Sequence, residues 1–202
     1  MSVTSPMTQS TSEVLKAALE PLASQGWAVV ETPELESLSL KLYETALVQK
    51  NLMRPAQIGR GNDLQRLDTV RTDSIDWQDF EPDSRPYQFL SLLRNHLNEA
   101  FYLGLKEWEC HFAHYLPDGH YDWHIDQSRT HGNFERVITF VLYLNPEWQS
   151  NWGGELEIVE ASPILPKAGK LVLFNSQSIQ HRVKPCHHDR WSLTGWFLRS
   201  SL

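Results

Sequence analysis

From residue 105 onward, the chain alternates between short segments rich in β-branched and aromatic residues and turn sequences, with no helical pattern between them. Turn sequences such as Pro117-Asp118-Gly119 and Trp152-Gly153-Gly154 separate these segments. Closely spaced strands without intervening helices favour an antiparallel sandwich or jelly roll. The predicted strands cover residues 107–116, 121–125, 136–144, 154–159, 170–175, 181–184 and 191–198.

The half of the chain before this region has a different pattern, with apolar residues at helical spacing. Residues 51–81 lose that spacing and are typical of a long polar flap that carries short strands. We therefore expect a mainly β protein of the α+β class, with a flexible N-terminus at 1–12 and a single domain at 13–202. Residues 13–104 would supply helical support and the flap, and residues 105–202 the jelly-roll core. The predicted helices cover residues 13–22, 33–48 and 86–103.

Charge and cysteine content exclude several classes of protein. The chain has 18 Lys and Arg against 25 Asp and Glu, a net charge of −7. Binding to nucleic acids or anionic membranes depends on clustered Lys and Arg, so we expect neither partner. The longest apolar stretch, 137–144, is too short to span a bilayer. Cys110 and Cys186 give no disulfide framework or zinc motif, and the N-terminus shows no secretion signal, so we expect a cytoplasmic protein, monomeric or weakly dimeric.

His124, Asp126 and His181 form the constellation that carries chemistry. Side chains two positions apart in a strand project from the same face, so His124 and Asp126 point into the same space. If His181 arrives from a strand across the sandwich, two imidazoles and one carboxylate hold a metal and leave the opposite positions open, which is the ligand set of non-haem Fe(II) oxygenases. A tetrahedral zinc site stays an alternative. The other histidines, including His111, are expected at the surface or behind the ligands, because the triad is complete without them.

Arg190 lies nine positions after His181, at the start of the last predicted strand. Alternation puts Arg190 and Ser192 on one face, where a guanidinium fork and a hydroxyl suit a carboxylate. A dicarboxylate co-substrate fits this arrangement, since its 2-oxo acid end would bind the iron while its far carboxylate reaches Arg190, leaving one metal position for O₂. These residues predict the oxidative decarboxylation of 2-oxoglutarate coupled to attack on a C–H bond.

Residues 70–198 resemble the Fe(II) and 2-oxoglutarate dioxygenases of the prolyl 4-hydroxylase type, above all the hypoxia-factor prolyl hydroxylases and their bacterial relatives. The resemblance implies a double-stranded β-helix (jelly roll), Fe(II) held by the triad, no catalytic residue beyond the metal ligands, and ascorbate as reductant. It implies that Tyr143 of Tyr143-Leu144-Asn145 bonds the distal carboxylate of 2-oxoglutarate and that Tyr115 closes the co-substrate pocket. The residues assigned to the co-substrate are then Arg190, Tyr143, Tyr115, Thr139 and Ser192.

Residues 71–77 (RTDSIDW) are similar to the family's Arg-Gly-Asp-x-Ile-x-Trp element, with Thr72 in place of the glycine. By resemblance, this element folds over the active site and pairs Asp73 with Arg136. Trp77 and Trp196 would then flank the entrance. The predicted substrate-binding residues are Arg71, Asp73, Trp77, Arg136 and Trp196.

The leading hypothesis is hydroxylation of a prolyl residue in a protein or peptide, with conversion of 2-oxoglutarate and O₂ into succinate and CO₂. A long flap that can fold over an extended chain favours a protein substrate, and a free amino acid or small molecule is the alternative. Two further classes stay open: a zinc-dependent hydrolase or isomerase that uses Glu155 or Glu157 as acid or base, and a non-enzymatic binding module. A nucleic acid demethylase is disfavoured, because it would carry a second arginine six positions after Arg190, whereas Arg199 lies nine after it.

Overall fold

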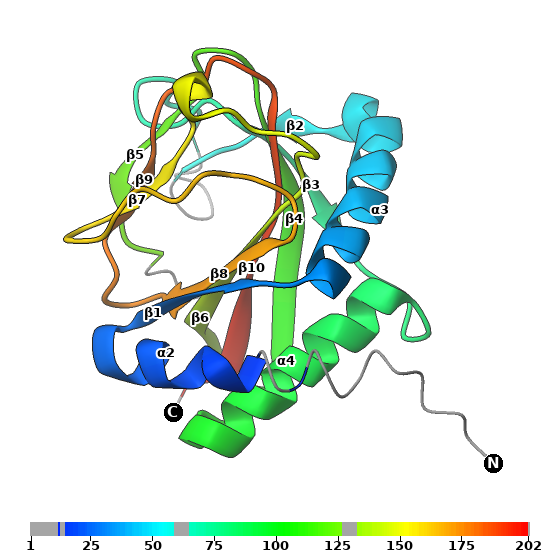
Figure 1. Cartoon of the computed structure of the whole chain (residues 1–202), viewed down its shortest axis with the longest axis vertical. Helices are drawn as coiled ribbons and strands as arrows, with labels where there is room; N and C mark the ends of the chain where they lie inside the picture. Colours follow the sequence, from blue (N-terminus) through cyan, green and yellow to red (C-terminus); the bar gives the residue numbers. More distant parts are fainter. Residues whose placement is uncertain (1–11, 13–14, 59–64, 127–132, 202) are drawn as a thin grey trace.

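The computed structural model describes Ser12 and residues 15–58, 65–126 and 133–201 of the 202-residue chain. Two antiparallel sheets face each other, and helices cover the outer side of the larger one (Figure 1). Within the described part of the chain, no helix is both long enough and apolar enough to cross a membrane. The predicted flexible N-terminus at 1–12 lies outside the described residues, apart from Ser12.

The larger sheet has seven strands in the order β1-β8-β6-β10-β4-β3-β2, and the smaller has three in the order β5-β9-β7. β10 is the longest strand and pairs with β4 on one side and β6 on the other. This arrangement confirms the predicted mainly β jelly roll with N-terminal helices. The strands are β1 (Trp27–Glu31), β2 (Arg54–Pro55), β3 (Ser74–Gln78), β4 (Glu107–Tyr115), β5 (Tyr121–His124), β6 (Phe134–Tyr143), β7 (Leu156–Ile158), β8 (Lys170–Asn175), β9 (His181–Val183) and β10 (Arg190–Ser200).

Strands β4 to β10 match the seven runs expected from the sequence, whereas β1 was not predicted. β1 lies between two helices and adds an outer strand to the large sheet by pairing with β8, from Trp27 opposite Phe174 to Glu31 opposite Lys170. Its alternation of buried and exposed residues lasts only five positions. An alternating pattern this short, lying between two helical patterns, is not recognised as a strand from the sequence. The strand that pairs with it lies far away along the chain, so no local signal marks the pairing.

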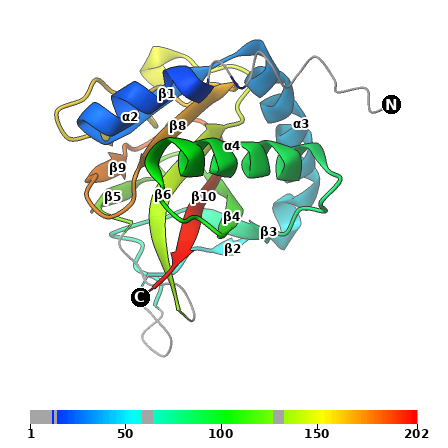
Figure 2. The same ribbon diagram turned by 90° about the horizontal axis from the view of Figure 1, so that it is seen from below.

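The two long helices begin at capping residues that the sequence makes recognisable, Thr32 and Ser84. The Leu35 backbone N–H donates to the Thr32 hydroxyl at 3.1 Å, and Pro33 opens the helix. Figure 2 shows α4 lying across the outer face of the large sheet. The predicted helices agree with these elements, and within the first, predicted at 13–22, the described residues 15–17 and 19–22 are helical, with a turn at 18. The helices are α2 (Leu19–Gln25), α3 (Pro33–Gln49) and α4 (Arg85–Phe101), with 3₁₀ turns η1 (Lys50–Leu52) and η3 (Ser150–Trp152).

The predicted flap at 51–81 is anchored to the large sheet in its described part. β2 pairs with β3, and β3 pairs with β4 from Ser74 opposite His114 to Gln78 opposite Cys110. A hydrogen-bonded edge strand holds its side chains in a fixed alternation. The flap therefore presents Trp77 to one side of the sheet at a defined position.

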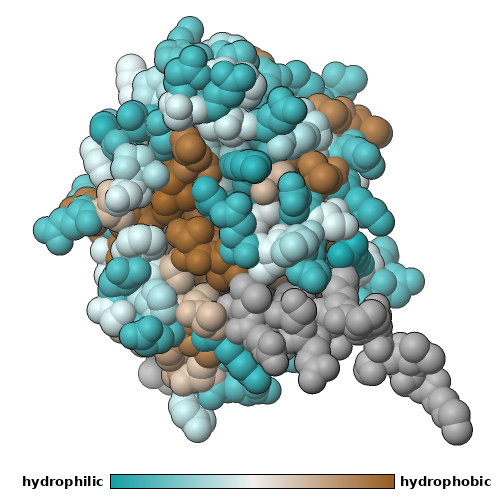
Figure 3. All heavy atoms as spheres, in the orientation of Figure 1, coloured by the Kyte–Doolittle hydropathy of each residue, from teal (hydrophilic) through white to brown (hydrophobic). Residues whose placement is uncertain are grey.

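Two apolar layers fill the molecule on either side of the large sheet. Along β4, Cys110 and Phe112 belong to the layer under the helices, whereas Ala113 and Tyr115 belong to the layer between the sheets. Strand alternation produces this division. Side chains at the odd-numbered positions of β4 therefore face the space between the two sheets. On the outside of the molecule, Figure 3 shows that hydrophilic side chains cover most of one face, with apolar ones gathered near its middle.

Truncating Leu97 should destabilise the fold, because this α4 side chain has no exposed surface and lies in the layer between helix and sheet. We expect Leu97→Ala to lower the free energy of unfolding by about 3 kcal/mol through lost apolar burial and the cavity left behind. Leu47→Ala, on a helical side chain that is 44% exposed, should cost less than about 1 kcal/mol. Urea unfolding followed by circular dichroism measures both values, and equal losses would contradict this assignment of the core.

A candidate metal centre between the sheets

His124 and His181 face each other from neighbouring strands. His124 ends β5, His181 begins β9, and the two are direct partners in the antiparallel register of the small sheet. The expectation that His181 comes from across the sandwich is therefore wrong: both histidines belong to one sheet. Sheet order depends on pairing between distant segments, which the local pattern around His181 does not encode. Asp126 follows two residues after His124, just beyond the end of β5, and its carboxylate reaches the same point as the two imidazoles.

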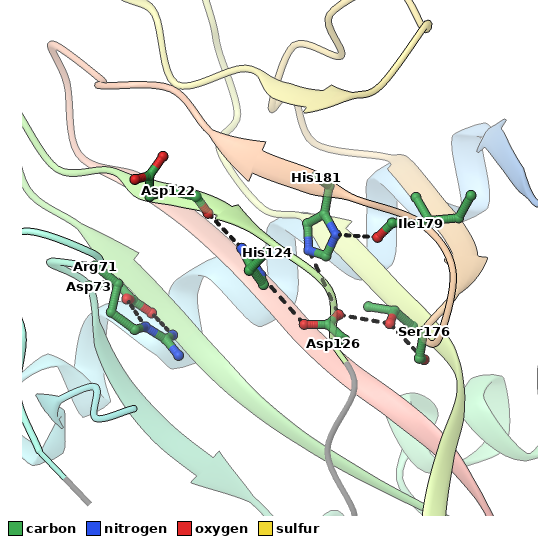
Figure 4. Close-up of polar contacts among 9 residues, drawn as sticks. Arg71, Asp73, Asp122, His124, Asp126, Ser176, Ile179 and His181 are labelled. Carbon is green, nitrogen blue, oxygen red and sulfur yellow. Dashed lines mark hydrogen bonds and ion pairs between the residues drawn. The ribbon is translucent and has the colours of Figure 1, made fainter. Parts of the chain in front are cut away.

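The three side chains converge on one point, as Figure 4 shows. Their candidate ligand atoms all lie within 4.8 Å of one another. The distance between His124 Nε2 and Asp126 Oδ1 is 3.5 Å, and that between His181 Nε2 and Asp126 Oδ2 is 3.8 Å. These separations are long for direct hydrogen bonds and suit atoms that share a cation.

Backbone carbonyls fix which nitrogen of each imidazole faces this point. His124 Nδ1 lies 2.7 Å from the carbonyl oxygen of Asp122, and His181 Nδ1 lies 3.1 Å from that of Ile179. A carbonyl only accepts, so Nδ1 donates its proton in both rings. The Nε2 lone pairs are left facing Asp126, ready to bind a metal.

The protonation states of the cluster also suit a metal. Burial by itself would raise the pKa of Asp126, but the neighbouring His181 and His124 outweigh it and hold that pKa below its usual range. For His181, burial lowers the pKa to about 4 against the opposing charge of Asp126. At neutral pH the carboxylate is therefore ionised and His181 is neutral, which are the forms that ligate metals.

Arg190 lies deeper in the same cavity, which has a volume of about 940 Å³. The Arg190 side chain is buried between the rings of Tyr115 and Tyr143, with its guanidinium carbon 5.0 and 5.1 Å from the ring centres. Its Nε donates to the carbonyl oxygen of Gly154 at 2.8 Å. In the described part of the chain, no acidic side chain forms an ion pair with it. A buried cation without an anionic partner is costly, so this end of the cavity is suited to an anion.

Tyr143 supplies a second unsatisfied group beside Arg190. Its hydroxyl is fully buried and has no hydrogen-bond partner among the described residues. Burial raises the pKa of Tyr143 to about 12, against the opposing effect of Arg190. Ser192 lines the cavity, and its hydroxyl oxygen lies 3.1 Å from the hydroxyl oxygen of Thr194. Tyr143 packs against Arg190 but is not among the residues that line the cavity, whereas Arg190 and Ser192 are, so the guanidinium is the group that faces an anion there.

Thr139 does not lie with this pair of groups. Its hydroxyl donates to Asp126 Oδ2 at 2.8 Å and also contacts the Ser176 hydroxyl at 2.8 Å. Thr139 was predicted to belong to the co-substrate residues, whereas the structure brings it to the carboxylate of the metal triad. Ser176 was not singled out from the sequence, because no motif marks a serine after β8.

The flap residues form a different set of pairs from the one expected. Asp73 is paired with Arg71 through two hydrogen bonds of 2.6 and 2.7 Å, not with Arg136. Arg136 instead pairs with Glu109 at 2.6 Å and stacks on Trp196, with its guanidinium carbon 3.5 Å from the ring centre. Arg71 and Asp73 are only two positions apart and so meet on one side of the chain. Arg136 and Glu109 reach each other because their strands, β6 and β4, both flank β10.

Aromatic side chains form the outer wall of the cavity. Trp77 is 53% exposed, and its ring centre lies 6.3 Å from that of the buried Trp196. His111 packs against both rings, at 5.0 and 5.5 Å. His111 is buried and lines the cavity, and burial, followed by the charge of Arg71, lowers its pKa to about 4. His111 lies four positions before Tyr115 on the same strand, so strand alternation alone predicts that both side chains face the cavity.

Comparison with known proteins places these features in a family context. The sequence model of the 2OG-Fe(II) oxygenase superfamily matches residues 110–198. A prolyl-4-hydroxylase from Pseudomonas putida is similar over 93% of this chain and all of its own, with 32% identity and a TM-score of 0.77. Two more distant structures share the fold. A prolyl hydroxylase from Trichoplax adhaerens, in complex with a hypoxia inducible factor peptide fragment, is 22% identical over 95% of this chain and 91% of its own, with a TM-score of 0.70. A viral collagen prolyl hydroxylase of Paramecium Bursaria Chlorella virus-1 is 16% identical over 88% and 98%, with a TM-score of 0.61.

Proposed function

Because this chain belongs to the 2OG-Fe(II) oxygenase superfamily, as a prolyl 4-hydroxylase-like member, we propose that it hydroxylates a prolyl residue in a protein or peptide. The observation that carries the proposal is the cavity itself. One space holds the cluster of two histidines and an aspartate and, further in, a buried arginine without an anionic partner. Exposed and buried tryptophans line the same space at its outer wall.

His124, Asp126 and His181 would hold Fe(II), and Arg190 with Tyr143 would bind the far carboxylate of 2-oxoglutarate. Bound iron and 2-oxoglutarate would supply the oxidising chemistry, in which O₂ and 2-oxoglutarate become succinate and CO₂ and one oxygen atom enters a C–H bond. The protein's own part is to orient these groups and to limit water around them. Tyr115 forms the wall beside the guanidinium, and ascorbate is the expected reductant.

The alternative of a zinc hydrolase lacks its acid or base. Glu157 pairs with Arg182 at 2.6 Å, and Glu155 lies 3.7 Å from Lys184. Neither glutamate is among the residues that line the cavity in the described part of the chain. A hydrolase would also have no use for an unpaired arginine beyond the metal ligands.

A prolyl substrate is supported by the aromatic wall and by the relatives. Tryptophan faces offer large apolar surfaces to a saturated ring such as that of proline. The Pseudomonas putida relative, at 32% identity, is a prolyl-4-hydroxylase, and the Trichoplax adhaerens protein was solved with a peptide. An extended peptide at the mouth of the cavity would contact Trp77 on the flap and bring one proline toward Trp196.

The proposal is tested by reconstituting the protein with Fe(II) without oxygen and adding 2-oxoglutarate. We expect a metal-to-ligand charge-transfer band in the visible region. With O₂ and a library of proline-containing peptides, we then expect succinate and peptides heavier by one oxygen atom. No band and no succinate would refute the oxygenase assignment for these residues. Succinate together with modification of residues other than proline would refute the prolyl substrate alone.

Replacing Trp77 by alanine should weaken the peptide substrate without changing the inner site. We expect the KM for a substrate peptide to rise roughly tenfold, equivalent to about 1.4 kcal/mol of lost contact. The affinity for 2-oxoglutarate should not change, because Trp77 lies at the outer wall. Tyr102→Ala, at a 91% exposed aromatic residue outside the cavity, is the matched control in steady-state assays. A Trp77→Ala enzyme with an unchanged peptide KM would contradict this role.

A further inference from the structure

Two buried hydroxyl groups stand behind the carboxylate of the metal triad. Thr139 lies on β6 opposite Phe174 of β8, and Ser176 follows that strand directly. Neither residue has any exposed surface. Figure 4 shows the Ser176 side chain on the side of Asp126 away from the His124 imidazole.

The hydrogen bonds of these groups can run in only one direction. An ionised carboxylate accepts hydrogen bonds and donates none, so Thr139 must donate its single hydroxyl hydrogen to Asp126 Oδ2. The contact between the two hydroxyls at 2.8 Å then requires Ser176 to donate to Thr139. The backbone N–H of Ser176 donates to the Val137 carbonyl at 3.0 Å and fixes the start of this chain.

The relay donates to one oxygen of Asp126 and not to the other. Oδ2 accepts from Thr139 and lies 3.8 Å from His181 Nε2, whereas Oδ1, which takes no hydrogen bond from the relay, lies 3.5 Å from His124 Nε2. We propose that the Ser176–Thr139 relay is a positioning device that restricts Asp126 to binding the metal through Oδ1 alone. This inference rests on the proposed function. A carboxylate bound through both oxygens would take up a metal position that 2-oxoglutarate or O₂ needs.

Valine and serine at position 139 separate the hydroxyl from the shape of the side chain. Thr139→Val keeps the branched shape and removes the donor, and Thr139→Ser keeps the donor. Partners of metal ligands typically change metal affinity by 10- to 100-fold. We therefore expect Thr139→Val to weaken Co(II) binding to the metal-free protein roughly tenfold. We also expect it to alter the visible absorption of bound Co(II), which reports its coordination number, and we expect Thr139→Ser to restore both.

The measurement is titration of the metal-free protein with Co(II), by calorimetry and by visible absorption, with thermal unfolding to confirm the fold of each variant. If Thr139→Val does not fold, Ser176→Ala gives the decision. Ser176→Ala leaves Thr139 in place but removes the hydroxyl group that donates to it. This variant should weaken Co(II) binding by a smaller factor than Thr139→Val, with the same kind of spectral change. Wild-type affinity and spectrum in the folded variant would overturn the relay while leaving the proposed function intact. A wild-type protein that does not bind Co(II) would overturn the proposed function and the relay with it.

Discussion

Replacing Asp126 by alanine is expected to abolish Fe(II)-dependent turnover. The substitution removes one of the three candidate ligands and the only negative charge among them. Since removing a mere partner of a metal ligand costs 10- to 100-fold in affinity, the loss of the ligand itself should weaken metal binding by more than about a hundredfold. Succinate formation and metal content after desalting measure the two effects.

Asp122→Ala is the matched control for this experiment. Asp122 lies on β5, two residues before His124, and within the described part of the chain its exposed side chain accepts a hydrogen bond only from the backbone N–H of Trp123, at 2.8 Å. The carbonyl that orients His124 belongs to the backbone and survives the substitution. We expect near wild-type turnover from this variant. Metal content in Asp126→Ala equal to that of the control would refute the ligand assignment.

Replacing Arg190 by alanine is expected to leave metal binding intact and to weaken 2-oxoglutarate binding roughly a hundredfold, equivalent to about 2.7 kcal/mol. The physical reason is the loss of charge-assisted hydrogen bonds to a carboxylate in a buried site. Arg190→Lys should recover part of the affinity, because a lysine keeps the charge but not the two-pronged geometry. Titration of the Fe(II)-loaded protein with 2-oxoglutarate, followed through the charge-transfer band, gives the dissociation constants.

Arg182→Ala is the arginine control. Arg182 lies on β9 only one residue from His181, but its side chain pairs with Glu157 and stacks on Trp123 outside the cavity. Its removal should not change 2-oxoglutarate affinity. If both arginine variants bound 2-oxoglutarate equally well, Arg190 would not be the anion anchor.

The parts of the site that sequence could predict are those set by local geometry. Arg190 and Ser192 share a face because they are two positions apart in β10, and the same spacing brings His124 and Asp126 together although β5 ends at His124. The jelly roll followed from strand runs and turn residues, which are also local signals. These elements needed no knowledge of which strands are neighbours.

The parts that sequence missed depend on contacts between distant segments. β1 becomes a strand by pairing with β8, and His181 lies in the same sheet as His124 because β9 pairs with β5. The partner of Asp73 was assigned by resemblance to a distant residue, whereas a nearer arginine is within reach. Ser176 enters the site only through the packing of β8 against β6.

Strand β10 sets the distance between the two ends of the cavity. Arg190, Ser192, Thr194 and Trp196 are alternate residues of this one strand, and all four line the cavity. Six residues of extended chain span about 20 Å, so the spacing between the anion anchor and the aromatic wall is fixed by covalent geometry. β10 is paired with β4 on one edge and with β6 on the other, and the one shift in its pairing register falls after Phe197, beyond Trp196. A shift of the β10 pairing register by a single residue would turn all four side chains toward the helices. The register of this one strand therefore keeps the proposed 2-oxoglutarate and the proposed peptide at a constant distance from each other.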